Sequence, residues 1–470
     1  MRRTILSLCI LFSLGAVAQE SHSLGDKIGK MTFEQVKSTM GIYEDEELLT
    51  FVKSVGKKLE AAMPKNDYDF KYYLVDVEEP NAFATAGGYV FVTRGLLAII
   101  DTEDELAGVL GHEFNHVLLK HSEKKLGRSM VPVVLELPGN LVGSLLSKTL
   151  GELMNNPIKF SSEVVGAAFD RGQENQADKG GVKLAADAGY DPTALVSALT
   201  KLDHFVMTLD SVDHGMHLFD DHPVTAKRVE NLHETLGEMD FDSTLVQRSL
   251  LPELDGLLVG QNPKNGVVLE DNLFLHPDMN FSYQLPAKWS TKNTPASLTA
   301  SNSKEGAALV LTFDGEHQTP KEAYKAYTKD LNKKGLGLIV DKKLIVNGME
   351  GIELTVEHYD GREEKTVLVW LKMEGAEGVL QFTGSGKDEA ALDTMNTSIR
   401  TFRTITEEER ARVFNKRLRY EKAPNETLGA YAKRKGMEGK IEALELINNV
   451  DADQKITSEY VKYLEKEPYQ

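Results

Sequence analysis

The chain has 470 residues, a length that fits two or three domains of about 100–200 residues each. Hydrophobic residues make up 41% of the chain and charged residues 27%, which leaves enough apolar material for a large globular core. The 54 basic and 72 acidic residues give a formal net charge of −18. This acidic excess argues against binding nucleic acid or an anionic membrane through bulk electrostatics, so we expect no nucleic-acid partner.

The N-terminus has the features of a secretory signal peptide. Arg2 and Arg3 precede an apolar run over residues 5–17, which is too short to span a membrane comfortably, and residues 16–18 form a small-residue cleavage site. We therefore expect residues 1–18 to be removed on export, with an uncleaved anchor as the alternative. Cys9 is the only cysteine, so the mature chain would have no disulfide and would rely on its core or a metal for stability.

The region after the signal peptide is predicted to be mainly helical with a small edge sheet. A short polar lead comes first. Apolar periodicity and turn residues then predict, in chain order, a helix over 44–63, strands over 69–77 and 89–93, a helix from Thr102 to about Leu126, and helices over 172–188, 192–209 and from Pro223 onward. Glu105 stands three positions after Thr102, and this pair predicts a capping box.

Glycine and proline cluster at about residues 255–275, where we place a domain boundary. Beyond it, strand-like runs outnumber helices and predict an α+β domain with an antiparallel sheet over residues 270–405. Residues 406–470 are charged and are predicted to form a helical tail. The expected fold class is therefore α+β throughout, with a mainly helical first domain.

His112 and His116 are the first candidates for a chemical site. They lie four residues apart in an amphipathic helix, so both imidazoles project from one face within reach of a single metal ion. Glu113 can act as a general base on water without taking a coordination position. Neutral imidazoles and an open four-coordinate site suit zinc, so we expect one zinc ion per chain. The alternative is a surface helix with two solvated histidines.

A catalytic zinc ion needs a third protein ligand, and a predicted helix downstream contains a candidate. Glu174 would complete a set of two histidines and one glutamate. Asp178, about one turn later, could bind the outer nitrogen of one histidine ligand and fix its tautomer. The competing interpretation is a charged, solvated helix face, because acidic residues at this spacing are common.

Several segments recur in the order found in one protease family. They are Asn81-Ala82-Phe83-Ala84, residues 87–96, residues 103–107 leading into the His112 to His116 motif, Glu174 with Ala177 and Asp178, residues 188–192, and His222-Pro223 followed by Arg228. This series resembles metallopeptidase family forty-eight. The family includes the CAAX prenyl endopeptidases, the mitochondrial inner-membrane quality-control peptidase and bacterial periplasmic proteases of outer-membrane assembly. The chain is similar to the soluble periplasmic branch.

The resemblance covers residues 44–235 and implies a zinc metalloprotease domain. With the signal peptide before it and the domain boundary after it, we place this domain over residues 19–262 and expect it in the periplasm; a secreted or membrane-anchored protein is the alternative. The resemblance also implies the following roles: zinc ligands His112, His116 and Glu174, catalytic acid/base Glu113, and outer partner Asp178. Asn115 departs from the family, which usually has a small residue there. Because that position points away from the metal, we expect altered packing and intact chemistry.

Two further histidines lie close to these motifs. His222 has two functional interpretations: it stabilises the oxyanion of the reaction, or it approaches zinc as an extra ligand in a blocked resting state. The competing interpretation is that it fixes the start of the helix beside Pro223. Arg228 is expected on that helix, facing the same region. His121 comes nine residues after His112, about 2.5 turns, and is expected to face away from the ligands in a structural role.

Asn81, Ala82 and Phe83 are expected at the edge strand of the cleft. An exposed edge can pair with an extended polypeptide through backbone hydrogen bonds and so tolerate varied sequences. Unfolded or misassembled envelope proteins fit that mode of binding. Residues 130–150 are apolar but interrupted by proline and glycine, which suggests a lid over the cleft.

Residues 281–289 resemble the opening strand of Mog1/PsbP-like α+β modules, and we see no catalytic constellation in that domain. We interpret it as a docking module for an envelope-protein partner. The leading hypothesis is a zinc-dependent endopeptidase that cleaves envelope or misfolded proteins in the periplasm. The alternative is a chaperone or scaffold for envelope proteins with latent protease activity.

Overall fold

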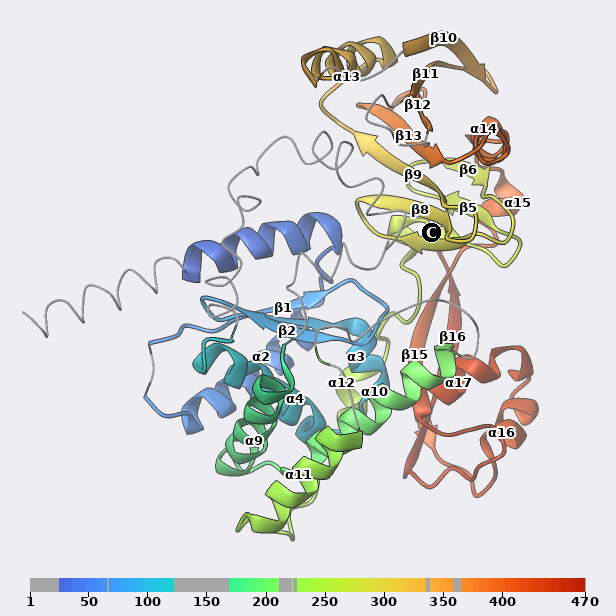
Figure 1. Ribbon diagram of the computed structural model, residues 1–470. Helices are drawn as coiled ribbons and strands as arrows, with labels where there is room; N and C mark the ends of the chain where they lie inside the picture. The colour runs from blue at the N-terminus through green and yellow to red at the C-terminus, as the bar shows by residue number, and fades with distance from the viewer. Residues whose placement is uncertain are drawn as a thin grey trace, which may run out of the picture. The chain divides into compact units, whose positions relative to one another are not determined.

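The computed structural model describes residues 25–65, 67–121, 169–210, 222, 226–334, 339–357 and 365–469. The predicted signal peptide and the predicted lid at residues 130–150 lie outside these ranges. Contacts divide the chain into two compact units (Figure 1). The described residues up to 259, together with 417–465, belong to the first unit. Among the described helices, none combines the length and hydropathy that crossing a membrane requires.

The first unit contains a three-stranded sheet in the order β1-β3-β2. β1 (Lys71–Val75) runs parallel to β3 (Tyr89–Thr93), and β3 runs antiparallel to the edge strand β2 (Ala82–Thr85). Side chains alternate between the two faces of the sheet. Phe83 and Phe91 pack with Val36 of a helix over residues 25–39, a helix that was not predicted within the polar lead.

The opposite face of the sheet joins the main apolar core, to which the helices of this unit contribute. In chain order they are α2 (Glu46–Ala62), α3 (Arg94–Ile99), α4 (Glu103–Leu118), α9 (Arg171–Asp187), α10 (Ala194–Asp210), α11 (Ala226–Glu238) and α12 (Leu251–Leu254). Leu106, Leu110 and Phe114 of α4 are fully buried in this core. The predicted helices over 44–63, 172–188 and 192–209 are confirmed within a few residues.

The predicted capping box at the start of α4 is confirmed: the Thr102 hydroxyl accepts from the Glu105 amide, and the Glu105 carboxylate accepts from the Thr102 amide. The predicted end at Leu126 is wrong, because α4 ends at Leu118. Lys120 has a left-handed backbone with φ of 55°, which an α-helix does not continue through. The chain therefore changes direction just before His121.

The C-terminal region corrects a second prediction. The tail over residues 406–470 contains the helices α15 (Glu407–Arg410), α16 (Leu428–Arg434) and α17 (Ile441–Asn448). It also contains a two-stranded sheet of β15 (Phe414–Lys422) and β16 (Tyr460–Pro468). The expectation of a helical tail is therefore wrong in part. Both strands are rich in charged residues, which hides the alternation that would mark them as strands.

A buried charge cluster joins this C-terminal segment to the start of α4. The Lys462 side chain of β16 is 1% exposed, and its ammonium lies 2.7 Å from an Asp101 carboxylate oxygen. It also donates to the last carbonyls of α3, at 3.0 Å for Ala98 and 3.2 Å for Ile99. Lys201 of α10 lies 2.6 Å from Glu105, the capping-box residue. The cluster thus connects the C-terminal segment to the end of α3 and, through Asp101 and Lys201, to α10 and the start of α4.

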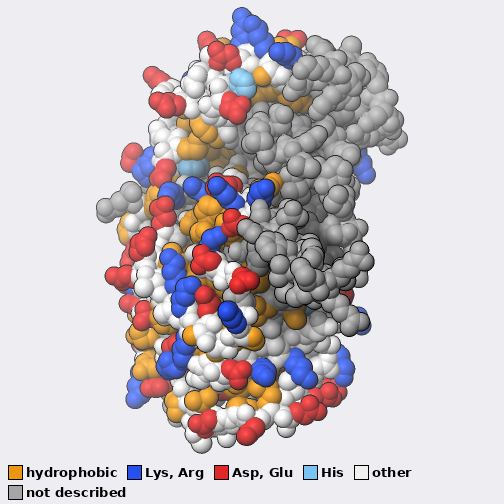
Figure 2. Space-filling model, turned by 90° about the vertical axis from the view of Figure 1, so that its left-hand side faces the viewer, with side chains coloured by type: hydrophobic (Ala, Val, Ile, Leu, Met, Phe, Trp, Pro, Cys, Tyr) orange, Lys and Arg blue, Asp and Glu red, His pale blue; other side chains and the backbone are white. Residues whose placement is uncertain are grey.

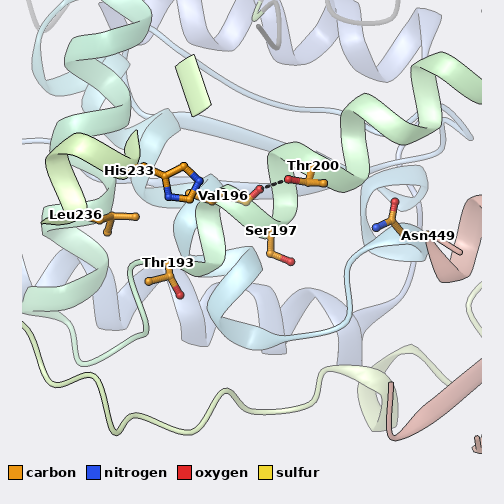
Figure 3. Close-up of a pocket in the computed structure, with 7 residues that line it drawn as sticks. All are labelled: Thr193, Val196, Ser197, Thr200, His233, Leu236 and Asn449. Carbon is orange, nitrogen blue, oxygen red and sulfur yellow. Dashed lines mark hydrogen bonds between the residues drawn. The ribbon is translucent and has the colours of Figure 1, made fainter. Parts of the chain in front are cut away.

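A pocket of about 410 Å³ is lined by residues of α10 and α11 and by Asn449, just after α17. Figure 3 shows His233 and Leu236 of α11 on one side, and Val196, Ser197 and Thr200 of α10 on the other. The Thr200 hydroxyl donates to the Val196 carbonyl at 2.8 Å, within its own helix. Ser197 hydrogen-bonds Glu105 at 2.5 Å. The hydroxyls of Thr200 and Ser197 therefore make hydrogen bonds that stabilise the fold.

The second unit confirms the predicted α+β domain with an antiparallel sheet. Its larger sheet has the order β10-β11-β12-β13-β9-β8-β7, and a smaller sheet has the order β14-β6-β5-β4. The bounds are β4 (Val267–Val268), β5 (Leu273–His276), β6 (Phe281–Gln284), β7 (Ser290–Asn293), β8 (Ser297–Asn302), β9 (Ala307–Asp314), α13 (Pro320–Lys334), β10 (Ile339–Val346), β11 (Met349–Glu357), β12 (Lys365–Leu371), β13 (Val379–Gly386), α14 (Glu389–Arg400) and β14 (Arg403–Thr404). Met395 and Ile399 of α14 pack on one face of the larger sheet.

Acidic and basic side chains are mixed on the surface. On the described part of the face in Figure 2, Asp and Glu side chains alternate with Lys and Arg. Mixed surface charge of this kind favours solubility.

Candidate metal centre

Close packing of α4 on α9 brings the predicted ligands together. At the crossing, a Cβ added to Gly181 of α9 would stand 2.8 Å from the backbone nitrogen of His112. A Cβ added to Gly111 of α4 would stand 2.9 Å from the Gly181 carbonyl oxygen. The two backbones therefore touch without intervening side chains. This close approach lets Glu174, in the first turn of α9, reach both histidines of α4.

We expect Gly181→Ala to destabilise the first unit. Alanine favours a helix interior over glycine by about 1 kcal/mol, so a purely local effect would be stabilising. Overpacking against the backbone of His112 costs about 1–3 kcal/mol and pushes α9 away from α4. Denaturant unfolding measures the stability, and zinc titration should show weaker binding. Gly237→Ala in α11 is the matched control, since a Cβ there meets nothing within 4 Å; stabilisation by both substitutions would contradict the packing.

Four side chains form one cluster at this crossing: His112, His116, Glu174 and His222. One donor atom from each lies within 4.8 Å of all the others. His112 Nε2 is 3.0 Å from His116 Nε2 and 3.3 Å from His222 Nδ1. The Glu174 Oε1 atom is 2.9 Å from His222 Nδ1 and 3.3 Å from His116 Nε2. Residues from three separate segments of the sequence thus converge on one point.

The geometry of this cluster fits a zinc ion. Tetrahedral zinc with bonds of about 2.0–2.1 Å holds its donors about 3.3 Å apart, close to the distances found here. The set of three imidazoles and one carboxylate is also a donor set that zinc accepts. Two imidazole nitrogens 3.0 Å apart repel each other when both present lone pairs, and a shared cation removes that repulsion.

Asp178 and Arg228 hold the outer side of the cluster. Asp178 Oδ1 lies 2.8 Å from His112 Nδ1, the nitrogen that faces away from the cluster. Arg228 donates two hydrogen bonds to the Asp178 carboxylate, at 2.9 and 2.7 Å, and lies 2.9 Å from Glu174. Its guanidinium also donates to the His222 carbonyl at 3.2 Å. Arg228 thereby fixes the positions of both carboxylates and of His222.

The prediction that His121 faces away from the ligands is wrong. Because α4 ends before this residue, His121 turns back, and its Nδ1 lies 3.0 Å from His116 Nδ1. His121 Nε2 lies 3.3 Å from Oε1, the side-chain amide oxygen of Gln176 on α9. Phe169 packs against the same ligand, with its ring centroid 4.0 Å from that of His116. A nine-residue helical spacing misplaces His121 because the spacing assumes an unbroken helix.

Glu113 is buried beside the cluster but does not belong to its donor set. Its Oε2 accepts a hydrogen bond of 3.0 Å from the backbone N–H of Ala84, and its Oε1 lies 3.7 Å from His222 Nε2. Burial raises the pKa of the Glu113 carboxyl, and the nearby His222 and His112 offset this only in part. A carboxyl with a raised pKa is suited to taking up and releasing a proton.

The pKa values of His116, Glu174 and His222 shift in different directions. Burial lowers the pKa of His116 to about 2, so its ring is neutral. Burial alone would raise the pKa of Glu174, but the His116 and His222 side chains beside its carboxylate outweigh this effect and lower that pKa. Burial alone would lower the pKa of His222, but Glu113 and Glu174 outweigh it and raise that pKa. Within the cluster, the Glu174 carboxylate is therefore anionic and the His116 imidazole is neutral, and both states suit the binding of a cation.

The structure places the three predicted substrate-binding residues on and just before the edge strand β2. The backbone N–H of Asn81 donates to the Thr93 hydroxyl at 2.8 Å. Ala82 and Phe83 pair with Val92 and Phe91 of β3 and are buried. Ala84, one residue further, makes the contact with Glu113 that no sequence pattern indicated.

Asn115, the residue that departs from the family pattern, bonds within its own helix. Its side-chain amide donates to the Gly111 carbonyl at 2.8 Å, and its side chain lies against the site of Gly180 on α9. The absence of a Cβ at Gly180 makes room for this larger side chain.

Comparisons with known proteins agree with this geometry. A model of peptidase family M48 matches residues 44–236, which include every residue of the cluster. Metalloprotease LoiP of Escherichia coli (strain K12) is 30% identical over 241 residues, covering 48% of this chain and 87% of LoiP. The chain belongs to peptidase family M48. As an M48 protein with metalloprotease relatives, it is a metalloendopeptidase.

Other M48 relatives share only part of their length with this chain. The beta-barrel assembly-enhancing protease of Escherichia coli (strain K12) is 28% identical over 200 residues, which are 40% of this chain and 40% of that protein. The mitochondrial metalloendopeptidase OMA1 of Schizosaccharomyces pombe is 28% identical over 217 residues, covering 44% and 61% of the two chains. The likeness thus centres on the M48 region.

Proposed function

We propose that this M48 protein is a zinc-dependent endopeptidase in which His112, His116 and Glu174 hold zinc and Glu113 is the general acid/base. The observation that carries the proposal is the position of Glu113. Its carboxyl is buried next to the four-residue cluster, has a raised pKa and is not among the cluster's donor atoms. It is therefore available for proton transfer next to a cation site.

When bound, zinc supplies Lewis acidity, which polarises a peptide carbonyl and makes water a stronger nucleophile at neutral pH. Glu113 takes a proton from the water that attacks the carbonyl carbon and delivers it to the departing amide nitrogen. The Ala84 N–H orients the Glu113 carboxylate for this transfer. Asp178 keeps the His112 proton on Nδ1, so that Nε2 presents its lone pair to the cluster.

We assign two roles in the active site to His222. Its Nδ1 lies among the cluster donors, where it can complete the coordination of zinc in a resting state. Its Nε2 faces Glu113 at 3.7 Å. In the other role, the protonated imidazole would donate a hydrogen bond to the developing oxyanion. The second role needs the proton that the adjacent carboxylates favour on this ring.

The substrate is proposed to add as a strand along the edge of β2. In the antiparallel pair with β3, the carbonyl of Asn81 points inward and accepts a hydrogen bond of 3.0 Å from the Thr93 backbone N–H. By the alternation of such a ladder, the backbone groups of Ala82 and Ala84 point outward, on the side where the Ala84 N–H meets Glu113. A polypeptide paired at this edge would pass next to the cluster. Because backbone hydrogen bonds would hold it, its side chains would have little influence on binding.

We further propose that the substrates are envelope proteins that are unfolded or misassembled, and that the protein works in the periplasm. Support comes from the predicted signal peptide and from relatives that are named for enhancing beta-barrel assembly. The second unit is proposed as a docking module for an envelope-protein partner.

Removal of the metal should abolish cleavage. We expect one zinc ion per chain by metal analysis, loss of cleavage of an unfolded casein-like substrate after chelation, and recovery with stoichiometric zinc. Magnesium is the matched control, because it prefers oxygen ligands in octahedral geometry and should not restore activity. Undiminished cleavage by the fully chelated protein would contradict the proposal.

A further inference from the structure

The outer nitrogens of the two α4 histidines have different partners. The His112 Nδ1 atom faces the carboxylate of Asp178, which can only accept a hydrogen bond and so defines the tautomer of His112. The His116 Nδ1 atom faces another imidazole, that of His121, at 3.0 Å. An imidazole nitrogen can donate or accept, so this contact alone leaves the tautomer of His116 undefined.

Gln176 resolves this ambiguity. Its side-chain amide oxygen Oε1 lies 3.3 Å from His121 Nε2, and this oxygen can only accept a hydrogen bond. A single proton on His121, placed on Nε2, satisfies the contact and leaves Nδ1 as an acceptor. That acceptor favours the proton of His116 on Nδ1 and so opposes the Glu174 carboxylate, which lies 3.3 Å from His116 Nε2 and favours a proton there. The His116 Nε2 atom then presents its lone pair to the cluster, as metal coordination needs.

We propose that His121 is a positioning residue that, together with Gln176, keeps the proton of His116 on Nδ1 and so directs its Nε2 lone pair into the metal site. The order of donation is His116 Nδ1–H to His121 Nδ1, then His121 Nε2–H to the Gln176 oxygen. His121 is 1% exposed, so water does not compete freely for its ring. The left-handed turn at Lys120 is what places His121 beside His116.

This inference rests on the proposed zinc site, and its test has one readout of zinc affinity and one of the tautomer itself. Zinc affinity is measured by competition with a chromophoric chelator. His121→Phe keeps a planar ring but removes the acceptor, and we expect it to weaken zinc binding about 10–100-fold, the usual cost of losing such an outer partner. His121→Asn keeps a carbonyl acceptor and is expected to restore affinity to within a few-fold of the parent.

Gln176→Leu, on the exposed side of α9, is expected to weaken binding by a smaller factor. Lys183→Leu is its matched control, because Lys183 lies two turns further along the same face of α9 and is also exposed. Affinity of the folded His121→Phe protein equal to that of the parent would overturn the proposal. Equal losses for His121→Phe and His121→Asn would also overturn it, since a merely structural role predicts no rescue by an acceptor.

The second readout is nitrogen NMR of the protein with ¹⁵N-labelled histidine, prepared without metal. We expect the proton of His116 on Nδ1 in the parent and a mixture of tautomers in His121→Phe and Gln176→Leu. A His116 proton on Nε2 in the parent would overturn the proposal. Failure of the parent to bind zinc would instead defeat the proposed function, and the tautomer measurement would still decide whether His121 and Gln176 act as inferred.

Discussion

Glu113→Gln should reduce peptide cleavage by two to four orders of magnitude while leaving zinc bound, because general acid–base catalysis contributes about 10²–10⁴-fold. Glutamine has nearly the same shape as glutamate and still accepts the hydrogen bond from the Ala84 N–H. It cannot take a proton from the attacking water. The donors of the metal cluster are unchanged by this substitution, so metal analysis should still give one zinc ion per chain.

The matched control is Asn115→Ala, two positions along the same helix. It restores the small residue typical of the family and removes only a hydrogen bond to the Gly111 carbonyl, so activity should persist. Rapid cleavage of a casein-like substrate by zinc-loaded Glu113→Gln would contradict the acid/base assignment. The same variant tests the alternative of a chaperone or scaffold: rescue of an envelope-stress phenotype by Glu113→Gln would favour that alternative over proteolysis.

Lys462→Met should lower the free energy of unfolding of the first unit by about 3–5 kcal/mol, the usual cost of removing one partner of a buried ion pair. The ammonium is 1% exposed and has four partners, namely Asp101 and the carbonyls that end α3. Its loss leaves those carbonyls without their donor and leaves Asp101 with Lys201 as its remaining partner in this cluster. Because Lys201 also binds the capping residue Glu105, the start of α4 should lose rigidity.

Denaturant unfolding of the full chain measures this effect, and Lys455→Met is the control, since Lys455 is exposed in the same C-terminal segment. The double variant Asp101→Asn with Lys462→Met should lose less than the sum of the two single losses, because it removes both charges of the pair. A change below about 0.5 kcal/mol for Lys462→Met, the range of ordinary surface substitutions, would show that the Lys462 ammonium does not stabilise the first unit.

Local patterns predicted the elements that carry the chemistry. The capping box of Thr102 and Glu105 and the four-residue spacing of His112 and His116 depend only on hydrogen bonds and helix geometry within a few residues. The structure shows both as predicted. The α+β character of the second unit was also predictable, because strand-like runs and turn residues are local signals. The charged strands β15 and β16 were not, because their pairing with each other decides their conformation.

The sequence by itself determined which residues could bind a metal and which helix displays them. Only the tertiary structure decided how they meet. Glu174 reaches the histidines because Gly111 and Gly181 let two helix backbones touch, and His121 turns toward His116 because the helix ends at Leu118. Lys462 meets Asp101 from more than 350 residues away. Such contacts depend on how helices pack and where they stop, and these are set by the whole core rather than by any local run of residues.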